Sequence, residues 1–265
     1  MKKLSFLAMV VILAASVPLY ASSLCSVDGS PVACNTDNNS NGSVTLGTYH
    51  GSSAYALTLA NPDNGGTPNV FIATSDIPAS NLLGNTVGLF EAYVPTQTYQ
   101  GEPYMYYTVY NGTSIFDGYA LVIAANSGFT AATDSWYQDG LIATSTVHLV
   151  FGDGWTPANM GITNSDWTTC CSDLPTLAQL DSVVIPGMGG EDWGGLSIYK
   201  ARVAIGDSGS GTPGYTADIS SVELNPPVVT PEGGSGNLYL LLAGMACFAA
   251  MFLGRRWGSV SAPAN

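Results

Sequence analysis

The sequence predicts an all-β fold, an antiparallel β-sandwich that is jelly-roll-like. Short runs rich in Val, Ile, Thr, Tyr and Phe alternate with clusters of Gly, Asn, Asp, Pro and Ser, which is the pattern of strands joined by turns. Many short strands with turn-rich connections favour two packed antiparallel sheets. A short helix is expected around Asp173 to Leu180, within the longest irregular stretch, 152–193. We expect strands near residues 43–49, 53–60, 69–74, 86–94, 104–110, 118–125, 145–151, 196–205 and 215–224.

The N-terminal residues 1–21 have the pattern of a secretory signal peptide. Lys2 and Lys3 form a positive start, an apolar run extends from Leu4 to Leu19, and Ala21 offers a small residue for cleavage. A membrane-spanning helix needs about 20 apolar residues. This run is shorter and holds Pro18 near its end. We therefore expect residues 1–21 to be a signal helix that is removed and takes no part in the fold.

A second apolar run lies near the C-terminus, from Leu238 to Leu253, and is followed by Arg255 and Arg256. As a helix this run reaches about 24 Å, which is less than a hydrocarbon core of roughly 30 Å. A run that is apolar on all sides and ends in charge argues against a buried core helix. Because Arg favours the cytoplasmic side, we expect a single weak crossing, with the chain before residue 238 outside.

The C-terminal features occur in a specific order. The short motif Pro231-Glu232-Gly233 precedes the apolar run, and Arg255 and Arg256 follow it. This order resembles the PEP-CTERM sorting signal, which exosortases process in Gram-negative bacteria. The resemblance covers about residues 229–256, although Gly233 stands where the family usually has Pro, and residues 257–265 extend past the arginines. It implies export, an exosortase-like processing enzyme as a partner, transient anchoring in the inner membrane through the C-terminal helix, and a final place at the cell surface or in the extracellular matrix.

Between the two ends, residues 22–224 form the predicted ectodomain and residues 225–230 a stiff linker to the sorting tail at 231–256. Residues 22–229 hold only two basic residues, Lys200 and Arg202, against 18 acidic ones, so their formal net charge is −16. Nucleic acids and anionic membrane surfaces bind through clustered Lys and Arg. The composition therefore excludes nucleic acid as a partner and suits weak binding of divalent cations.

The predicted ectodomain has an even number of cysteines, which in an exported protein favours disulfides. Cys25 and Cys34 flank Asp28-Gly29, a hairpin-turn signal that would bring them face to face. That pairing leaves Cys170-Cys171 as a vicinal bridge. The alternative ties the N-terminal hairpin to the 170 loop by two bridges. We favour the local Cys25–Cys34 pair.

The only two cations of residues 22–229 lie on one predicted strand. Side chains alternate across a strand, so Tyr199, Ala201, Val203 and Ile205 are expected on one face, and Lys200 and Arg202 on the other. We expect these cations to pair with acidic residues on adjacent strands.

A stretch beginning at Asp37 matches the opening of a calcium loop. Asp37, Asn39 and Asn41 supply oxygen side chains at positions 1, 3 and 5, and Gly42 stands at position 6. Thr48 occupies position 12, where a bidentate carboxylate is needed. An Asn- and Gly-rich surface loop is the favoured interpretation. We expect no cofactor, with Ca²⁺ at this loop as the alternative.

We predict no catalytic residue and no enzymatic activity. The GDSG string at 206–209 resembles that of chymotrypsin-like serine proteases, but about twenty residues remain between Ser208 and the linker, and neither His50 nor His148 has the sequence context of that family. We favour a turn at GDSG and structural or solvated histidines. Glycoside hydrolysis needs two carboxylates across a cleft, and the sequence gives no reason to choose among Glu91, Glu102 and Glu191.

Each of the four tryptophans of the predicted ectodomain lies near acids and glycines. An exposed aromatic face beside carboxylates suits sugar rings, which offer C–H faces for stacking and hydroxyls for hydrogen bonds. The favoured alternative is that each ring fills the core and the acids form turns. The four candidates are Trp136, Trp155, Trp167 and Trp193.

Together these features favour a non-catalytic, exported protein of the cell surface or of a biofilm or exopolysaccharide matrix. The alternative is an extracellular carbohydrate-binding module whose partner is extracellular polysaccharide, and a secreted hydrolase comes third.

Overall fold

The computed structural model describes residues 24–38, 42–60, 67–78, 81–95, 102–169, 173–206 and 215–226. Its regular structure is mainly β, arranged in two sheets, and the described ranges hold one α-helix, α2 (Leu177–Asp181), besides short 3-10 turns. These ranges contain no helix with the length and apolar character that a membrane crossing requires. The predicted signal peptide, the sorting motif and the apolar run at 238–253 lie outside the described residues, so they stay predictions.

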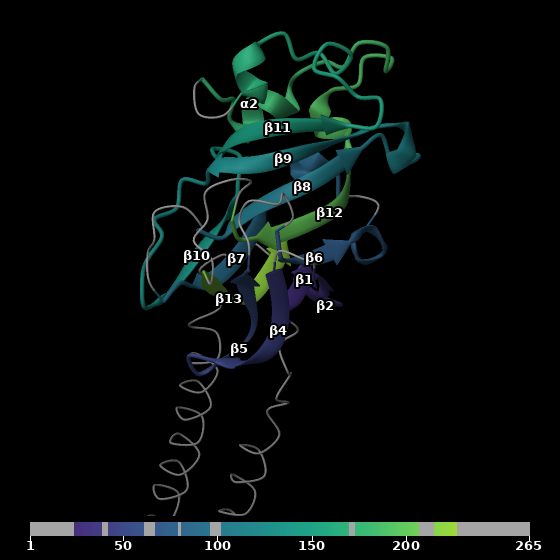
Figure 1. The fold of residues 1–265 in the computed structure, drawn as a ribbon. Helices are drawn as coiled ribbons and strands as arrows, with labels where there is room; N and C mark the ends of the chain where they lie inside the picture. The colour runs from purple at the N-terminus through teal and green to yellow at the C-terminus, as the bar shows by residue number, and fades with distance from the viewer. Residues whose placement is uncertain are drawn as a thin grey trace, which may run out of the picture. The chain divides into compact units, whose positions relative to one another are not determined.

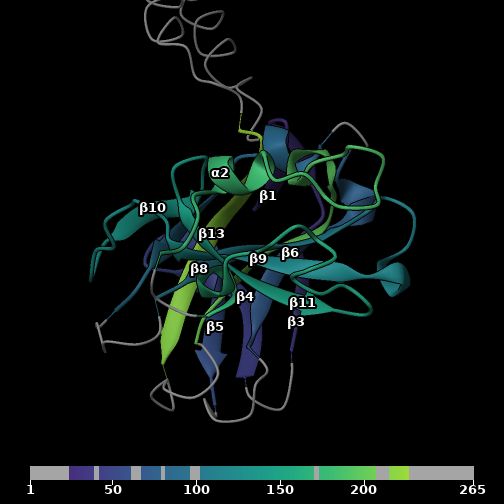
Figure 2. The ribbon, with the colours of Figure 1, turned by 90° about the horizontal axis from the view of Figure 1, so that it is seen from above.

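Seven strands form the first sheet: β1 (Cys25–Val27), β2 (Ser30–Val32), β4 (Gly42–Tyr49), β5 (Ser52–Leu59), β7 (Gly88–Tyr93), β10 (Trp136–Leu141) and β13 (Thr216–Leu224). Their order is β10-β7-β13-β1-β2, and β13 also pairs with β5, which pairs with β4. All pairs are antiparallel except β1 with β13. Figure 2 shows β13 beside the β4–β5 hairpin.

Six strands form the second sheet: β3 (Asn35–Asp37), β6 (Asn69–Ala73), β8 (Tyr104–Tyr110), β9 (Tyr119–Asn126), β11 (Thr146–Gly152) and β12 (Ser197–Ala204). Their order is β11-β9-β8-β12-β6-β3, and every pair is antiparallel. In Figure 1 the labelled strands β11, β9, β8, β12 and β6 follow one another down the page, with α2 next to β11.

One hydrophobic core takes side chains from both sheets. In β7, Phe90 is buried while its neighbour Glu91 is partly exposed. In β8, Met105 is buried and Tyr106 is partly exposed. Because successive side chains of a strand point to opposite faces, each sheet turns an apolar face to the core and a more polar face away from it. Each large apolar side chain buried in this way contributes about 1.5–3 kcal/mol.

All nine predicted strands are present, with ends that differ by at most two residues from the prediction. Four short strands, β1, β2, β3 and β10, were not predicted. β1, β2 and β3 have three residues each, too few to show a period. β10 carries polar Gln138 and Asp139 and is extended because it pairs with β7. The predicted helix is present but begins later, at Leu177, because Thr176 and Gln179 form a capping box there.

The local disulfide is confirmed. Cys25 and Cys34 are bonded, with their Cα atoms 5.3 Å apart. Asp28 and Gly29 both adopt positive φ, at 51° and 72°, which is the geometry of a two-residue hairpin turn between β1 and β2. The pair Cys170-Cys171 lies outside the described residues.

The predicted arrangement of β12 is correct except at Tyr199. Ala201 and Val203 are buried, and Lys200 and Arg202 are partly exposed, as expected. The register of β12 against β8 shifts between Ile198 and Lys200. This bulge leaves Tyr199 partly exposed beside Lys200, instead of on the buried face.

The predicted pairing of these cations with acids is also wrong for the described residues. Among them, no carboxylate lies within 4.0 Å of Lys200 or Arg202, and both cations lie over aromatic rings instead. The reason is the register, which places Phe71 and Tyr106 opposite Arg202 on the two neighbouring strands.

Removing the disulfide should destabilise the domain. We expect a Cys25→Ala/Cys34→Ala variant to lose roughly 2–3 kcal/mol of unfolding free energy, because the bridge closes a loop in the unfolded chain. Urea denaturation followed by circular dichroism measures this loss, and the wild-type protein in reductant should match the variant. The expectation is contradicted if the variant has the same urea midpoint as wild-type protein that is shown by mass to contain the disulfide.

Candidate binding site

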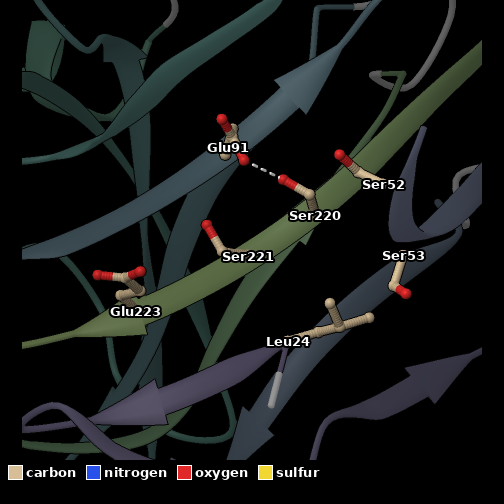
Figure 3. A pocket seen from close by; sticks show the side chains of 7 residues that line it. All are labelled: Leu24, Ser52, Ser53, Glu91, Ser220, Ser221 and Glu223. Carbon is tan, nitrogen blue, oxygen red and sulfur yellow. Dashed lines mark hydrogen bonds between the residues drawn. The ribbon is translucent and has the colours of Figure 1, made fainter. Parts of the chain in front are cut away.

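A pocket of about 410 Å³ lies over the face of the seven-stranded sheet that points away from the core. Its lining comes from β5, β7, β13 and the residue before β1. Two features dominate the lining, serine hydroxyls and two carboxylates. Figure 3 shows these side chains around the pocket. We call it the serine–glutamate pocket; it is lined by Leu24, Ser52, Ser53, Glu91, Ser220, Ser221 and Glu223.

A bulge in β13 gives the serine–glutamate pocket two adjacent serines. The register of β13 against β7 shifts between Ile219 and Ser221, so Ser220 is an extra residue on this strand. Its hydroxyl donates a hydrogen bond to Glu91 Oε2, drawn as a dashed line in Figure 3. This bond fixes one oxygen of the Glu91 carboxylate, while the other is left for a ligand or for water.

Three aromatic rings are in contact on the same sheet. The His50 and Tyr93 rings are stacked with centroids 3.6 Å apart, and Tyr93 meets Trp136 edge-on at 5.6 Å. We call His50, Tyr93 and Trp136 the aromatic group. His50 reaches the sheet because it occupies the β4–β5 turn, where His50 and Gly51 both adopt positive φ.

The aromatic group borders the serine–glutamate pocket. Tyr93 lies directly across from Trp136 on one side and from Asp218 on the other. Glu91 lies two residues before Tyr93 on the same strand, so both side chains are on the same face, about 7 Å apart along the strand. Ring faces, hydroxyls and carboxylates are therefore neighbours on one surface.

A histidine–aspartate pair holds the aromatic group in place. His50 Nε2 lies 3.3 Å from Asp218 Oδ2. Asp218 is only 6 % exposed, and this burial raises the pKa of its carboxyl, while the nearby His50 acts to lower it. The His50 side chain is 41 % exposed, so one edge of the stacked ring is open to solvent.

The arrangement has a definite chemical capacity. Partly exposed rings accept the apolar face of a ligand, and the adjacent carboxylate and hydroxyl oxygens accept its hydrogen bonds. A ligand that alternates C–H faces with hydroxyl groups fits both requirements.

The four predicted tryptophans have different surroundings. Trp193 is fully buried, and its Nε1 donates a hydrogen bond to the Met160 carbonyl. Trp155 is 7 % exposed and packs closely against Gly118. Trp167 is half-buried against the core. The core interpretation therefore describes Trp155 and Trp193. Trp136 is the one of the four that contacts Tyr93, the residue two positions after Glu91 of the serine–glutamate pocket.

The other predicted sites are only partly described. Asp37 ends the edge strand β3, whereas Asn39 and Asn41 lie outside the described residues. Within the described ranges, no group of three or more His, Cys, Asp or Glu residues could hold a metal ion. Ser208 also lies outside them. His148 Nε2 lies 3.0 Å from the Thr168 carbonyl oxygen.

Among the three candidate glutamates, only Glu91 lines the serine–glutamate pocket. Sequence reasoning missed its partners Ser220 and Glu223, as well as Tyr93 and Asp218. Alternation in β7 could have placed Glu91 and Tyr93 on one face, but the pairing of β7 with β13 cannot be read from local sequence.

A scan against protein-family models found no family that matches this chain, and a search of curated proteins found no match.

A second polar cluster lies away from the pocket. Burial, together with the negative charge of Asp192, raises the pKa of Asp181 to about 6. Its Oδ1 is buried without a hydrogen-bond partner among the described residues. Because the folded protein holds this proton more tightly than the unfolded chain, stability falls as pH rises from about 4 through about 6.

An Asp181→Asn variant should therefore be more stable than the wild type at pH 7. We expect a gain of roughly 1 kcal/mol, below the full value of a two-unit shift because the side chain is partly exposed. Thermal unfolding at pH 4 and pH 7 measures the gain, which should vanish at pH 4. The exposed Asp117→Asn is the matched control, and an equal gain at both pH values would refute the expectation.

Proposed function

We propose that this chain is an exported, non-catalytic protein of the cell surface or extracellular matrix that binds neutral polysaccharide. The serine–glutamate pocket and the bordering aromatic group form the binding surface. The observation that carries the proposal is that Tyr93, which contacts Trp136, lies on the same sheet face as Glu91 and two residues from it, and that Glu91 lines the pocket with the serines.

The chemistry of the surface favours a sugar over other small ligands. Pyranose rings present C–H faces that stack on aromatic rings, and their hydroxyls donate to carboxylates. The two glutamates of the pocket disfavour an anionic ligand at this face. A neutral glycan carries no charge for these carboxylates to repel.

We propose that the described domain is a β-sandwich with a jelly-roll-like topology. Support comes from two sheets whose buried faces contribute to one hydrophobic core. In such a fold the outer sheet faces stay open for binding while the core supplies stability.

Export and sorting are proposed from the two ends of the chain. The positive and apolar start at 1–21 supports secretion, and the order of Pro231-Glu232-Gly233, apolar run and Arg255-Arg256 supports processing by an exosortase-like enzyme. The disulfide Cys25–Cys34 supports an oxidising compartment. Binding of Ca²⁺ at Asp37, Asn39 and Asn41 stays an alternative to the absence of any cofactor.

Removing the Trp136 ring should weaken glycan binding. We expect Trp136→Ala to lower affinity for a neutral oligosaccharide about tenfold, because one stacking face is lost. Titration of intrinsic fluorescence with a panel of neutral glucans, xylans and mannans measures the loss. Phe116→Ala, which removes a ring that is 85 % exposed in another part of the fold, is the control and should bind normally.

The same titration tests the pocket carboxylate. We expect Glu91→Gln to weaken binding about fivefold, because an acceptor oxygen is replaced by a donor amide. Glu191→Gln, an exposed acid that does not line the pocket, is its matched control. No fluorescence change with any glycan of the panel would remove the proposal, and release of new reducing ends would show a hydrolase instead.

Processing can be followed in the native host. The intact mass of protein from the cell surface should lack residues 1–21 and the tail beyond the Pro231-Glu232-Gly233 motif. A Glu232→Ala variant should instead keep the tail and stay with the membrane fraction, whereas Glu191→Ala should be processed normally. Full-length protein in the cytoplasm with free thiols would contradict export.

A further inference from the structure

Lys200 and Arg202 are the only Lys or Arg residues among residues 22–229, and both lie on the outer face of the six-stranded sheet. Each is partly exposed. They occupy alternate positions on β12, so their side chains leave the strand on the same side, about 7 Å apart. This face is distinct from the one that carries the serine–glutamate pocket, which belongs to the other sheet.

Aromatic rings flank both cations. Lys200 Nζ lies 4.5 Å from the centre of the Phe71 ring and 5.5 Å from that of Tyr199. Arg202 Cζ lies 5.9 Å from the Phe71 ring centre and 5.3 Å from that of Tyr106. We call these five residues the cation band. It crosses β6, β12 and β8, which lie side by side in Figure 1.

Further rings extend the cation band at both ends. Tyr110 meets Tyr199 edge-on at 5.9 Å, and Tyr104 is stacked with Tyr106 at the same separation. The order Tyr110, Tyr199, Lys200 and Phe71, then Arg202, Tyr106 and Tyr104, alternates flat apolar surface with positive charge. A linear ligand that lies along it meets rings and cations in turn.

The aromatic rings stabilise the two cations but leave most of the N–H donors of Lys200 and Arg202 able to form hydrogen bonds. A cation–π contact contributes about 0.5–1 kcal/mol at an exposed site, and it leaves the ammonium and guanidinium N–H groups able to bind oxygen. Arg202 Nη1 donates to Thr108 Oγ1, so the guanidinium is held in one orientation. Among the described residues no carboxylate lies within 4.0 Å of either cation.

The direction of the pKa shift of Lys200 is consistent with a site that binds an anion. Burial lowers the pKa of Lys200, and the adjacent Arg202 lowers it further, while the negative charge of Asp37 acts to raise it. Two neighbouring positive charges repel each other, so an anion that binds between them lowers their electrostatic free energy.

We propose that the cation band binds a polysaccharide through a carboxylate-bearing sugar, such as a uronic acid residue within an otherwise neutral chain. The carboxylate binds Arg202 and Lys200, and the ring of the sugar stacks on Phe71, Tyr106 or Tyr199. A sparsely charged chain fits better than a dense polyanion, because residues 22–229 carry a net charge of −16. At physiological salt the screening length is about 8 Å, so an isolated carboxylate at the band experiences mainly the two adjacent cations.

This site is independent of the proposed binding of neutral glycan at the serine–glutamate pocket. The two sites lie on different sheets and use oppositely charged side chains. Either binding proposal can therefore be refuted while the other holds, and separate variants test each site.

The test compares two matched probes on the full-length protein. One is a xylo-oligosaccharide that carries a single glucuronic acid, and the other is the same xylo-oligosaccharide without it. By isothermal titration calorimetry we expect at least tenfold tighter binding of the acidic probe, and a preference that shrinks as salt is raised.

Variants assign this preference to residues. Lys200→Met/Arg202→Met should abolish it, and Arg202→Lys should lose most of it, because Lys cannot form the bidentate contact with a carboxylate. Lys200→Gln, a single change at a partly exposed position, provides a milder variant should the double variant unfold. Phe116→Ala, which removes an exposed ring that belongs to neither proposed site, should keep the preference.

Equal affinity for both probes would overturn the inference, as would a preference that Lys200→Gln and Arg202→Lys both leave unchanged. Light scattering is recorded on the same samples. Association of the wild type that is lost in Lys200→Gln, without any preference for the acidic probe, would show that the face contacts a second copy of the chain, and would also overturn it.

Discussion

Burial of one face of each sheet in a shared core is the constraint on which the rest of the structure depends. A strand shifted by one residue would turn its apolar side chains to solvent. The alternation in β7, where Phe90 is buried and Glu91 is not, therefore fixes which residues point away from the core. Once register is fixed, residues far apart in sequence, such as Glu91 and Ser220, are brought into contact on an outer face.

Both outer surfaces that we propose as binding sites contain a β-bulge. In β13 the shift near Ser220 places an extra serine next to Glu91, and in β12 the shift near Tyr199 turns that ring outward beside Lys200. A bulge inserts one extra residue into a strand, and pairing resumes beyond it with the register shifted by one. It therefore changes the chemistry of an outer face locally, while the buried alternation elsewhere in the strand is kept.

The two sheets present opposite charges to solvent at these places. Glu91 and Glu223 line the serine–glutamate pocket of the first sheet, and Lys200 and Arg202 lie in the cation band of the second. Aromatic rings border both. The two proposed sites together would let the domain bind two chains of a mixed polysaccharide at once.

The sequence by itself determined the all-β character, the nine longer strands and the Cys25–Cys34 hairpin, because alternation and turn chemistry act over a few residues. It also placed Lys200 and Arg202 on one face. Only the tertiary structure decided that Trp193 is buried while Trp136 contacts Tyr93 on an outer sheet face, and that aromatic rings of β6, β8 and β12 lie beside the two cations. The physical reason is that strand pairing is non-local: the partner of β7 is β13, more than a hundred residues away, and no local pattern specifies it.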